Sequence, residues 1–297
     1  MKLYDRFARV YASGEYPNLS QTMATILPMV MKQYKIPTNG SKKILDVACG
    51  EGSFCVEMAK KGWAVTGVDQ SEEMLRLANH RAKKENMIIN FQKQDMRFID
   101  YNNEFDLATC WFDSLNYLIS NNDLQSAFNN ISRSLKPNGW FLFDMNTIYG
   151  LAVEWQRNRC YVQQETKDLL ELHRTSYDFE RNLGCVKITW FVKVDDKWEK
   201  FEEKHVERGF SISEVESCLE YAGFHVVDKM SSLDPITPLA HNSGRAWFLA
   251  RKEPSISATD SQLPRFAQTS GPSTCLFACS AGSGGTTPAA MVYLLCR

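Results

Sequence analysis

Short apolar runs alternate with helix-like segments along the first half of the chain. Five of these runs have the length and the flanking turn residues of strands: KILDVA, WAVTGVD, IINFQKQD, FDLATCWF and GWFLFDMN. A segment between two of them has Leu124, Phe128, Ile131 and Leu135 on one helical stripe, which stops at Pro137. Strands that alternate with helices predict an α/β fold, a parallel sheet with helices on both faces.

Polar residues at the ends of the helical segments support these boundaries. Ser71 is placed to cap a helix that has acidic residues in its first turn and basic residues in its last turn. Ser213 and Glu216 have the spacing of a capping box, and Gly223 follows as the stop of that helix. The runs FHVVDKM and RAWFLARK then supply two further strands, which complete the sheet.

Three segments differ from this alternating pattern. The first 40 residues have helical spacing, with Leu27 and Val30 on one face. Residues 151–210 contain CVKITWFVKV and KFEEKHVERGF with no helix between them, which predicts an inserted hairpin or small antiparallel sheet with its turn at Asp195-Asp196. Residues 253–297 are rich in Gly, Ser, Thr, Pro and Ala, and this composition predicts a disordered tail.

Composition narrows the class of protein. The chain of 297 residues is 44% hydrophobic, enough for one large core, and its formal net charge is −1 with no run of basic residues, which disfavours nucleic acid as a partner. Its nine cysteines have no CxxC pair, so we expect reduced thiols and no metal site. The start of the chain does not resemble a signal peptide, and no apolar run is long enough to span a membrane. We therefore expect a soluble cytoplasmic protein without membrane contact.

Two glycines mark the turn between the first strand and the following helix, in DVACGEGSF. Asp46 ends the predicted strand, and Gly50 and Gly52 lie in the turn. Glycine lets a ligand lie against bare backbone, and the N–H groups of a helix start favour an anionic group. A nucleotide-type ligand fits this pattern, although an ordinary turn with two glycines would look similar.

A second acidic residue, Asp69, ends the next strand 19 residues after Gly50. A carboxylate at this place can accept hydrogen bonds from both hydroxyls of a ribose. A helix N-cap is the alternative role for Asp69, but Ser71 already has that role. A nicotinamide dinucleotide is disfavoured because Cys55 stands where its fingerprint needs a third glycine.

The pattern Asp46-x-Ala48-x-Gly50-x-Gly52 resembles the first motif of class I S-adenosylmethionine-dependent methyltransferases. Four further segments resemble later motifs of that family in the same order: GVDQSEEML, QKQDMRF, FDLATCWFDSLNYL and LKPNGWFLFDMNT. The resemblance covers residues 40–147 well and residues up to 252 more loosely. It implies a seven-stranded, mostly parallel Rossmann-like sheet, with S-adenosylmethionine as the cofactor and residues 41–252 as the methyltransferase domain.

The resemblance also implies roles for individual residues. The methionine part of the cofactor would lie along the first motif, the ribose on the second acidic segment and the adenine on the third, which gives the set Asp46, Ala48, Gly50, Gly52, Asp69, Gln70, Met74, Asp95, Met96 and Cys110. Ordinary core packing is an equally good explanation for the two methionines. Residues 1–40 resemble the lid helix of small-molecule methyltransferases, including deoxyaminosugar N-methyltransferases. Tyr4 and Tyr11 would then cover the cofactor, and a plain amphipathic helix is the alternative.

Methyl transfer needs an acceptor held in line with the methyl–sulfur bond, and it requires no metal. A base would assist if the acceptor is an amine or a hydroxyl. Candidates lie after the fourth and fifth strands and in the insert, and they are Asp113, Asn116, Tyr117, Asp144, Asn146 and His205. Of these, Asp144, Asn116 and His205 are the catalytic candidates, although a lone histidine on a strand is more often a packing residue. Arg208 and Arg245 could pair with an acidic acceptor, although solvated surface arginines are commoner.

These features favour an enzyme that methylates nitrogen or oxygen of a small molecule, as a monomer or a homodimer. A protein that binds the cofactor or its demethylated product without transfer is the alternative. Methylation of RNA or protein is disfavoured, because the chain lacks a basic surface and the segment after the fourth strand reads CWFDSLNYL.

Overall fold

The structure is a computed structural model that describes residues 16–37 and 42–254. By its contacts the chain divides into Met1–Glu253 and Pro254–Arg297, and the description below concerns the first unit. Tyr4 and Tyr11 of the expected lid, and the expected disordered tail, lie outside the described residues. Both therefore stay predictions.

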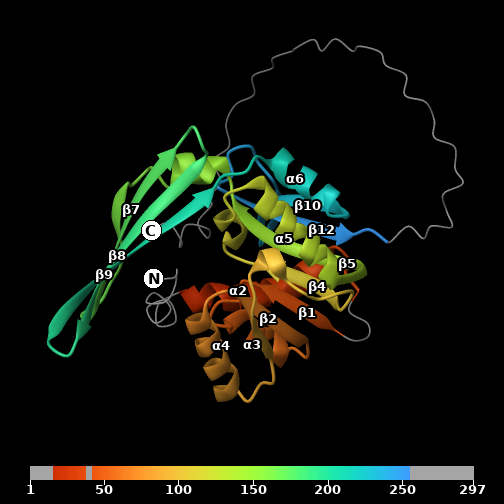
Figure 1. Ribbon diagram of the computed structural model, residues 1–297, viewed down its shortest axis with the longest axis horizontal. Coiled ribbons are helices and arrows are strands. Elements are labelled where there is room, and N and C mark those ends of the chain that lie inside the picture. The colour runs from red at the N-terminus through yellow and green to blue at the C-terminus, as the bar shows by residue number, and fades with distance from the viewer. Residues whose placement is uncertain (1–15, 38–41, 255–297) are drawn as a thin grey trace, which may run out of the picture. The chain divides into compact units, whose positions relative to one another are not determined.

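The main sheet contains eight strands in the order β11-β10-β12-β5-β4-β1-β2-β3 (Figure 1). Its parallel part is formed by β3 (Asn90–Lys93), β2 (Ala64–Asp69), β1 (Lys43–Val47), β4 (Phe105–Cys110) and β5 (Leu135–Asn146). Its antiparallel part is formed by β12 (Arg245–Lys252), β10 (Phe224–Leu233) and β11 (Ile236–Pro238). The mostly parallel α/β sheet is confirmed, but the number seven is wrong. The chain after β10 turns back at Asp234-Pro235 and adds the three-residue strand β11 to the sheet edge.

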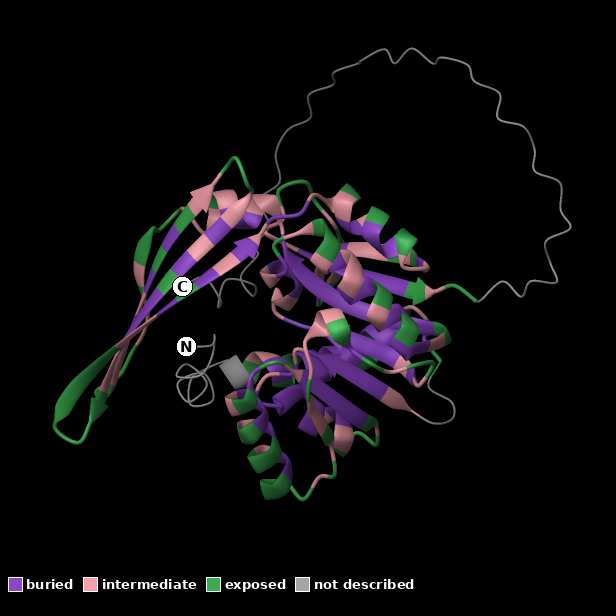
Figure 2. Cartoon of the chain, viewed as in Figure 1, coloured by how far each residue is buried: buried purple, intermediate pink, exposed green. Residues whose placement is uncertain are grey.

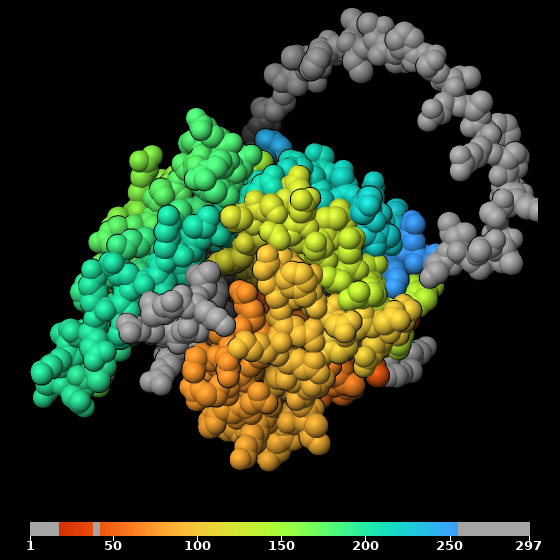
Figure 3. Space-filling view, in the orientation of Figure 1, coloured from red at the N-terminus to blue at the C-terminus, as the bar shows by residue number. Residues whose placement is uncertain are grey.

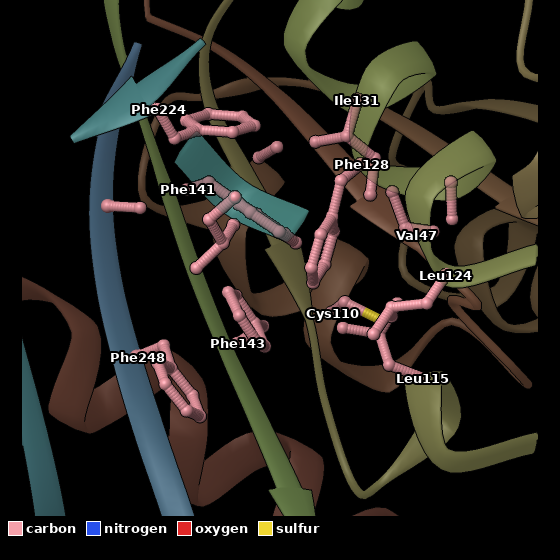
Figure 4. Close-up of a cluster of buried hydrophobic side chains, with 14 of the residues drawn as sticks. Val47, Cys110, Leu115, Leu124, Phe128, Ile131, Phe141, Phe143, Phe224 and Phe248 are labelled. Carbon is pink, nitrogen blue, oxygen red and sulfur yellow. The ribbon is translucent and has the colours of Figure 1, made fainter. Parts of the chain in front are cut away.

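Helices cover both faces of this sheet. The helices α2 (Tyr16–Gln33), α3 (Ser53–Lys60) and α4 (Glu72–Lys84) contribute apolar residues to one core, whereas α5 (Asn121–Ser134) and α6 (Ile212–Tyr221) contribute to the other. Phe128 of α5 packs against Phe141 and Phe143 of β5, with ring centroids 6.1 and 5.5 Å away (Figure 4). The central strands are buried on both sides (Figure 2), as expected for parallel strands.

Two predicted details of the helices differ from the structure. Leu135 is buried with the α5 stripe, but it begins β5, because α5 ends at Ser134. The capping box lies at Ser211 and Glu214, where each side chain binds the other residue's backbone N–H, at 3.2 and 2.8 Å. The predicted box at Ser213 and Glu216 is therefore wrong. Ser71 does cap α4, and its hydroxyl accepts from the N–H of Met74 at 3.3 Å.

The insert between β5 and α6 is a separate antiparallel sheet in the order β6-β7-β8-β9. Its strands are β6 (Cys160–Glu165), β7 (Leu169–Asp178), β8 (Leu183–Val194) and β9 (Lys197–Arg208). The predicted turn at Asp195-Asp196 joins β8 to β9, with Asp195 at positive φ. Figure 3 shows these strands in green beside the yellow residues that follow β4. Within the described ranges, no helix is both long and apolar enough to cross a membrane.

Candidate active site

The loop between β1 and α3 brings bare backbone to the carboxyl end of the sheet. Ala48, Gly50 and Gly52 all have positive φ, of 56, 55 and 80°. A Cβ atom on Gly50 would meet nothing within 4 Å, so Gly50 faces open space. A Cβ atom on Gly52 would lie 2.8 Å from the Cβ of Ala78 on α4. Gly50 therefore lies where a ligand can approach, whereas Gly52 allows close packing of the loop on α4.

The N–H groups of this loop have partners inside the chain. Gly50 donates to Asp69 at 2.9 Å, Gly52 donates to the carbonyl of Cys49 at 3.1 Å, and Ser53 donates to Glu51 at 3.3 Å. These three N–H groups are therefore already paired within the chain. The anionic group expected at the start of α3 stays a prediction, because these bonds do not involve the N–H groups of Phe54 and Cys55.

Asp69 ends β2 and holds this loop. One carboxylate oxygen accepts from Gly50, and the other accepts from the N–H of Ser71 at 2.8 Å. Burial raises the pKa of Asp69, and the hydrogen bonds oppose this effect. The backbone N–H of Gln70 also lowers the pKa of Asp69 through a hydrogen bond, and the Gln70 side chain is exposed beside it. A carboxylate has about four lone-pair sites, so roughly one remains after these three bonds. Asp69 can therefore accept a further hydrogen bond from a ligand.

Asp46 is buried behind the loop and does not face open space. Its carboxylate accepts from the hydroxyl of Thr109 on β4 at 2.8 Å and from the thiol of Cys55 on α3 at 3.2 Å. Burial is the main cause that raises the pKa of Asp46 to about 7. The side chain ties together β1, β4 and α3 where the sequence suggested a direct contact with ligand.

The expected adenine segment follows β3. Asp95 caps the short helix η1 (Met96–Phe98), and its carboxylate is clamped by Arg97, with a closest distance of 2.6 Å. Arg97 lowers the pKa of Asp95 and also contacts Asp123 at 3.1 Å. Met96 packs against the core that α5 forms with the sheet. Met74 on α4 and Cys110 at the end of β4 are buried. Arg97 was not a sequence candidate, and its position two residues after Asp95 was the available signal.

A buried charge network lies at the carboxyl ends of β4 and β5. Asp144 of β5 is fully buried, and it accepts from the N–H groups of Phe112 and Asp113 at 2.7 and 3.0 Å. Arg245 of β12 donates to Asp144 and, at 2.8 Å, to Asp113. Burial raises the pKa of Asp144, opposed by the guanidinium of Arg245. Asp144 thus fixes the loop after β4 and is itself covered.

The insert reaches this network through β9. Glu207 accepts from the side-chain amide of Asn146 at 2.8 Å, and burial, followed by the charge of Asp113, raises the pKa of Glu207 well above its usual range. Asn116 is also buried, and its amide donates to the carbonyls of Asn146 and Arg208 at 2.9 and 2.8 Å. Asn116 therefore connects β5 to β9 by hydrogen bonds. Its side chain is buried and is not freely accessible to an acceptor.

His205 lies two residues before Glu207 on the same face of β9. Its Nδ1 is 2.9 Å from the hydroxyl of Tyr117, the last residue of the short helix η2 (Ser114–Tyr117) that follows β4. Its Nε2 is 3.5 Å from a carboxylate oxygen of Glu203. His205 is buried, whereas Tyr117 is half-buried. The sequence had offered both residues as candidates but gave no sign that they touch, and it had not pointed to Glu203 or Glu207.

The two candidate arginines are both paired within the chain. Arg245 holds Asp113 and Asp144, and Arg208 donates to Glu214 at 2.9 Å and to Asn121 at 2.6 Å. Neither is free to bind an acidic acceptor without losing these partners. Among the residues that the structure describes, no group of three His, Cys, Asp or Glu side chains is placed to hold a metal ion.

The chain is similar to known methyltransferases over most of its length. Residues 44–139 match the family model described as a methyltransferase domain. A putative methyltransferase of Geobacillus sp. (strain WCH70) is 33% identical over 227 residues, which are 75% of this chain and 88% of that protein. This chain belongs to the S-adenosylmethionine-dependent methyltransferases. The putative methyltransferase YqeM of Bacillus subtilis (strain 168) is 32% identical over 222 residues, 74% of this chain and 87% of that one.

Solved structures show the same fold as this methyltransferase. An S-adenosylmethionine-dependent methyltransferase from Clostridium acetobutylicum has a TM-score of 0.73 at 24% identity, and the match covers 85% of this chain and 100% of that chain. An amino pentose methyltransferase from Micromonospora echinaspora, solved with S-adenosylmethionine bound, has a TM-score of 0.62 at 19% identity, and covers 85% and 97%. The cofactor of this methyltransferase is S-adenosylmethionine.

Three observations test whether the residues of this methyltransferase fit that cofactor. Gly50 faces open space, and Asp69 keeps about one unused lone pair beside it. The hydroxyl of Ser53, the first residue of α3, is buried and has no hydrogen-bond partner among the described residues. An open backbone cradle, a free acceptor and an unpaired hydroxyl meet at one loop, so the residues fit a ligand that carries hydroxyls and a polar tail.

Proposed function

We propose that this methyltransferase transfers the methyl group of S-adenosylmethionine to nitrogen or oxygen of a small molecule. The observation that carries the proposal is the contact between His205 of the insert and Tyr117 after β4, 2.9 Å apart. It places the insert over the carboxyl end of β4, next to the strand that leads into the glycine loop. Ligands of open α/β sheets bind outside these strand ends, so the insert would enclose an acceptor of limited size.

In this proposal the cofactor lies along the glycine loop. Ala48 and Gly50 contact its methionine part, Asp69 and Gln70 hold its ribose, and Met74, Asp95, Met96 and the backbone of Cys110 surround its adenine. Asp46 and Gly52 support the loop from behind. Tyr11 as a cover lies outside the described residues. The bound cofactor supplies an electrophilic methyl group on a positively charged sulfur.

The acceptor side is formed by groups that can remove a proton or bind a polar molecule. Tyr117 is half-buried, and its hydroxyl contacts the buried His205. Asp144 and Asn116 hold the surrounding loops in place through their hydrogen bonds. The net charge of −1 supports a small acceptor over a nucleic acid. The solved sugar N-methyltransferase from Streptoalloteichus sp. has a TM-score of 0.64 at 17% identity, which supports the fold, and its substrate class is one candidate for this site.

Label transfer tests this function. We would incubate the full chain with methyl-tritiated S-adenosylmethionine and separate fractions of a cell extract: molecules below 1 kDa, RNA and protein. Label in the small-molecule fraction is expected, and Asp69→Ala should reduce it at low cofactor concentration. Label in RNA or protein alone would contradict the small-molecule acceptor. Tight cofactor binding by calorimetry, without label in any fraction, would support the binding protein instead. The cytoplasmic location, the monomer or homodimer, and the absence of nucleic-acid and membrane partners stay predictions.

A further inference from the structure

Two groups of tyrosine, histidine and glutamate lie on one face of the inserted sheet. In the first, Tyr117 contacts Nδ1 of His205 at 2.9 Å, and Glu203 lies 3.5 Å from Nε2. The glutamate and the histidine are two residues apart on β9, so both point to the same face of the sheet. Each ring nitrogen of the histidine therefore has its own polar neighbour.

The second group repeats this arrangement on β7. Tyr161 of β6 contacts Nδ1 of His173 at 3.2 Å, and Glu171 contacts Nε2 at 2.5 Å. Register through β8 pairs His173 with Ile188 and Ile188 with Glu203, so the two groups flank β8 on one face. The same three side chains in the same order make the second group a matched internal comparison for the first.

The two groups differ in where their tyrosines lie. Tyr161 belongs to β6, the edge strand of the insert. Tyr117 belongs to η2, which contacts β5 and β9 and follows the carboxyl end of β4. Tyr117 is half-buried between buried neighbours Asn116 and Leu118, with a buried histidine behind its hydroxyl. Only the first group joins the insert to the edge of the sheet at which a ligand would bind.

We propose that Tyr117 is a catalytic residue that hydrogen-bonds the acceptor atom and takes its proton, while His205, with the charge of Glu203 3.5 Å from its Nε2, is the positioning residue that receives the phenol proton. This inference rests on the proposed function. Glu203 favours the tautomer with hydrogen on Nε2, which leaves the lone pair of Nδ1 free to accept from Tyr117. A proton relay through a tyrosine needs such an acceptor behind the hydroxyl.

The step balances as follows for an acceptor that carries an N–H or O–H bond. The lone pair of the acceptor atom forms the new bond to the methyl carbon, and the carbon–sulfur bond breaks with its electron pair staying on sulfur. The acceptor proton moves to the oxygen of Tyr117, and the phenol proton of Tyr117 moves to Nδ1 of His205. The positive charge of the sulfonium is thus replaced by the positive charge of an imidazolium, next to Glu203.

The described neighbours of His205 come from η2, β9 and β8. Tyr117 faces it from η2, and Glu203 and Glu207 lie on either side of it along β9. Across the sheet its register partner on β8 is Val186, and the residue beyond that on β7 is Thr175. Glu207 binds Asn146. Variants at His205 and Tyr117 therefore report on the contact between these two side chains.

Kinetics with a matched pair of variants test the proposal. The probes are methyl-tritiated S-adenosylmethionine and the purified labelled compound from the fraction below 1 kDa. Tyr117→Phe is expected to lower kcat by roughly 100-fold, with cofactor affinity by calorimetry unchanged and KM within about threefold. His205→Gln should cause a similar loss in kcat, again with cofactor affinity unchanged. Tyr161→Phe and His173→Gln should keep kcat within about twofold.

Spectroscopy of the chain without acceptor supplies the second measurement. The chain has five histidines, so the spectrum of nitrogen-15-labelled histidine can be assigned by comparison with His205→Gln. His205 is expected to show hydrogen on Nε2, and Tyr117→Phe should shift its Nδ1 signal. Wild-type kcat in Tyr117→Phe, an equal loss in Tyr161→Phe, or hydrogen on Nδ1 would overturn this inference alone. Absence of any transfer by the unmodified chain would overturn the proposed function together with it.

Discussion

The carboxylate of Asp69 accepts a hydrogen bond from the backbone N–H of Gly50, 2.9 Å away, and thereby ties the end of β2 to the loop after β1. The residue expected to hold the ribose also shapes the glycine loop. Its other oxygen binds Ser71, the cap of α4, so one side chain fixes two neighbouring elements. The geometry of the loop and the recognition of a ligand are therefore linked, and variants at this position affect both.

Substitution of Asp69 is expected to weaken cofactor binding. Asp69→Asn keeps the shape but replaces one acceptor oxygen by a donor, so we expect a loss of roughly 1 to 3 kcal/mol in binding free energy for S-adenosylmethionine. Isothermal titration calorimetry measures this loss. Asp100→Asn, with a side chain 95% exposed, is the control and should bind normally. Equal affinities in the two variants would rule out a ribose contact by Asp69.

Substitutions of Gly50 and Gly52 by alanine should differ in their effects on stability and on cofactor binding. Gly52→Ala places a methyl group 2.8 Å from Ala78 at positive φ, so it should lower the free energy of unfolding by roughly 2 kcal/mol or more. Gly50→Ala should cost only about 1 kcal/mol, because its Cβ enters open space. Urea denaturation compares the two. In calorimetry Gly50→Ala should lose more cofactor affinity than stability, and unchanged binding would show that no ligand occupies that space.

The buried carboxyl of Asp46 should make stability depend on pH. Burial raises its pKa to about 7 in the folded chain, against roughly 3.9 when unfolded. The folded state thus holds the proton more tightly, so this contribution to stability is present below about pH 4 and is lost as pH rises through 7. Asp46→Asn should reduce the fall in unfolding free energy between pH 5 and 8, measured with urea. Asp196→Asn, fully exposed, should retain the original slope, and an unaltered slope in Asp46→Asn would refute the assignment.

Removal of the arginine that faces Asp144 should destabilise the fold. Arg245→Gln leaves a fully buried carboxyl without its cation, and such a change costs about 3 to 5 kcal/mol. Arg251→Gln on the same strand is the matched control, because Arg251 is exposed and its guanidinium donates to the side chain of Asn138 at 2.9 Å. The double variant Arg245→Gln with Asp144→Asn should recover part of the loss. Thermal and urea unfolding measure these losses. If Arg245→Gln lowered the free energy of unfolding only as much as Arg251→Gln does, the stabilising role of the Arg245–Asp144 pair would be contradicted.

Local sequence patterns were enough to predict the core of the fold. Strands buried on both faces are apolar runs, and helices packed on them carry an apolar stripe. The elements β1, β2, β4 and α5 could therefore be predicted from the sequence. The cap at Ser71 could be predicted because its bond partner, Met74, is only three residues away in the sequence. The three-residue strand β11 and the frame of the capping box at Ser211 were missed, since several short polar stretches compete for these roles.

Sequence alone determined the alternation of strands and helices, the glycine loop, the acidic end of β2 and the resemblance to methyltransferases, because each of these depends on residues close together in the chain. Tertiary structure decided which candidates meet. It buried Asp46 and Asn116, paired Asp144 with Arg245, and brought His205 to Tyr117 across 88 positions of sequence. These pairings depend on how distant strands of the main sheet and the inserted sheet pack together, and no local pattern of apolar and polar residues records that packing.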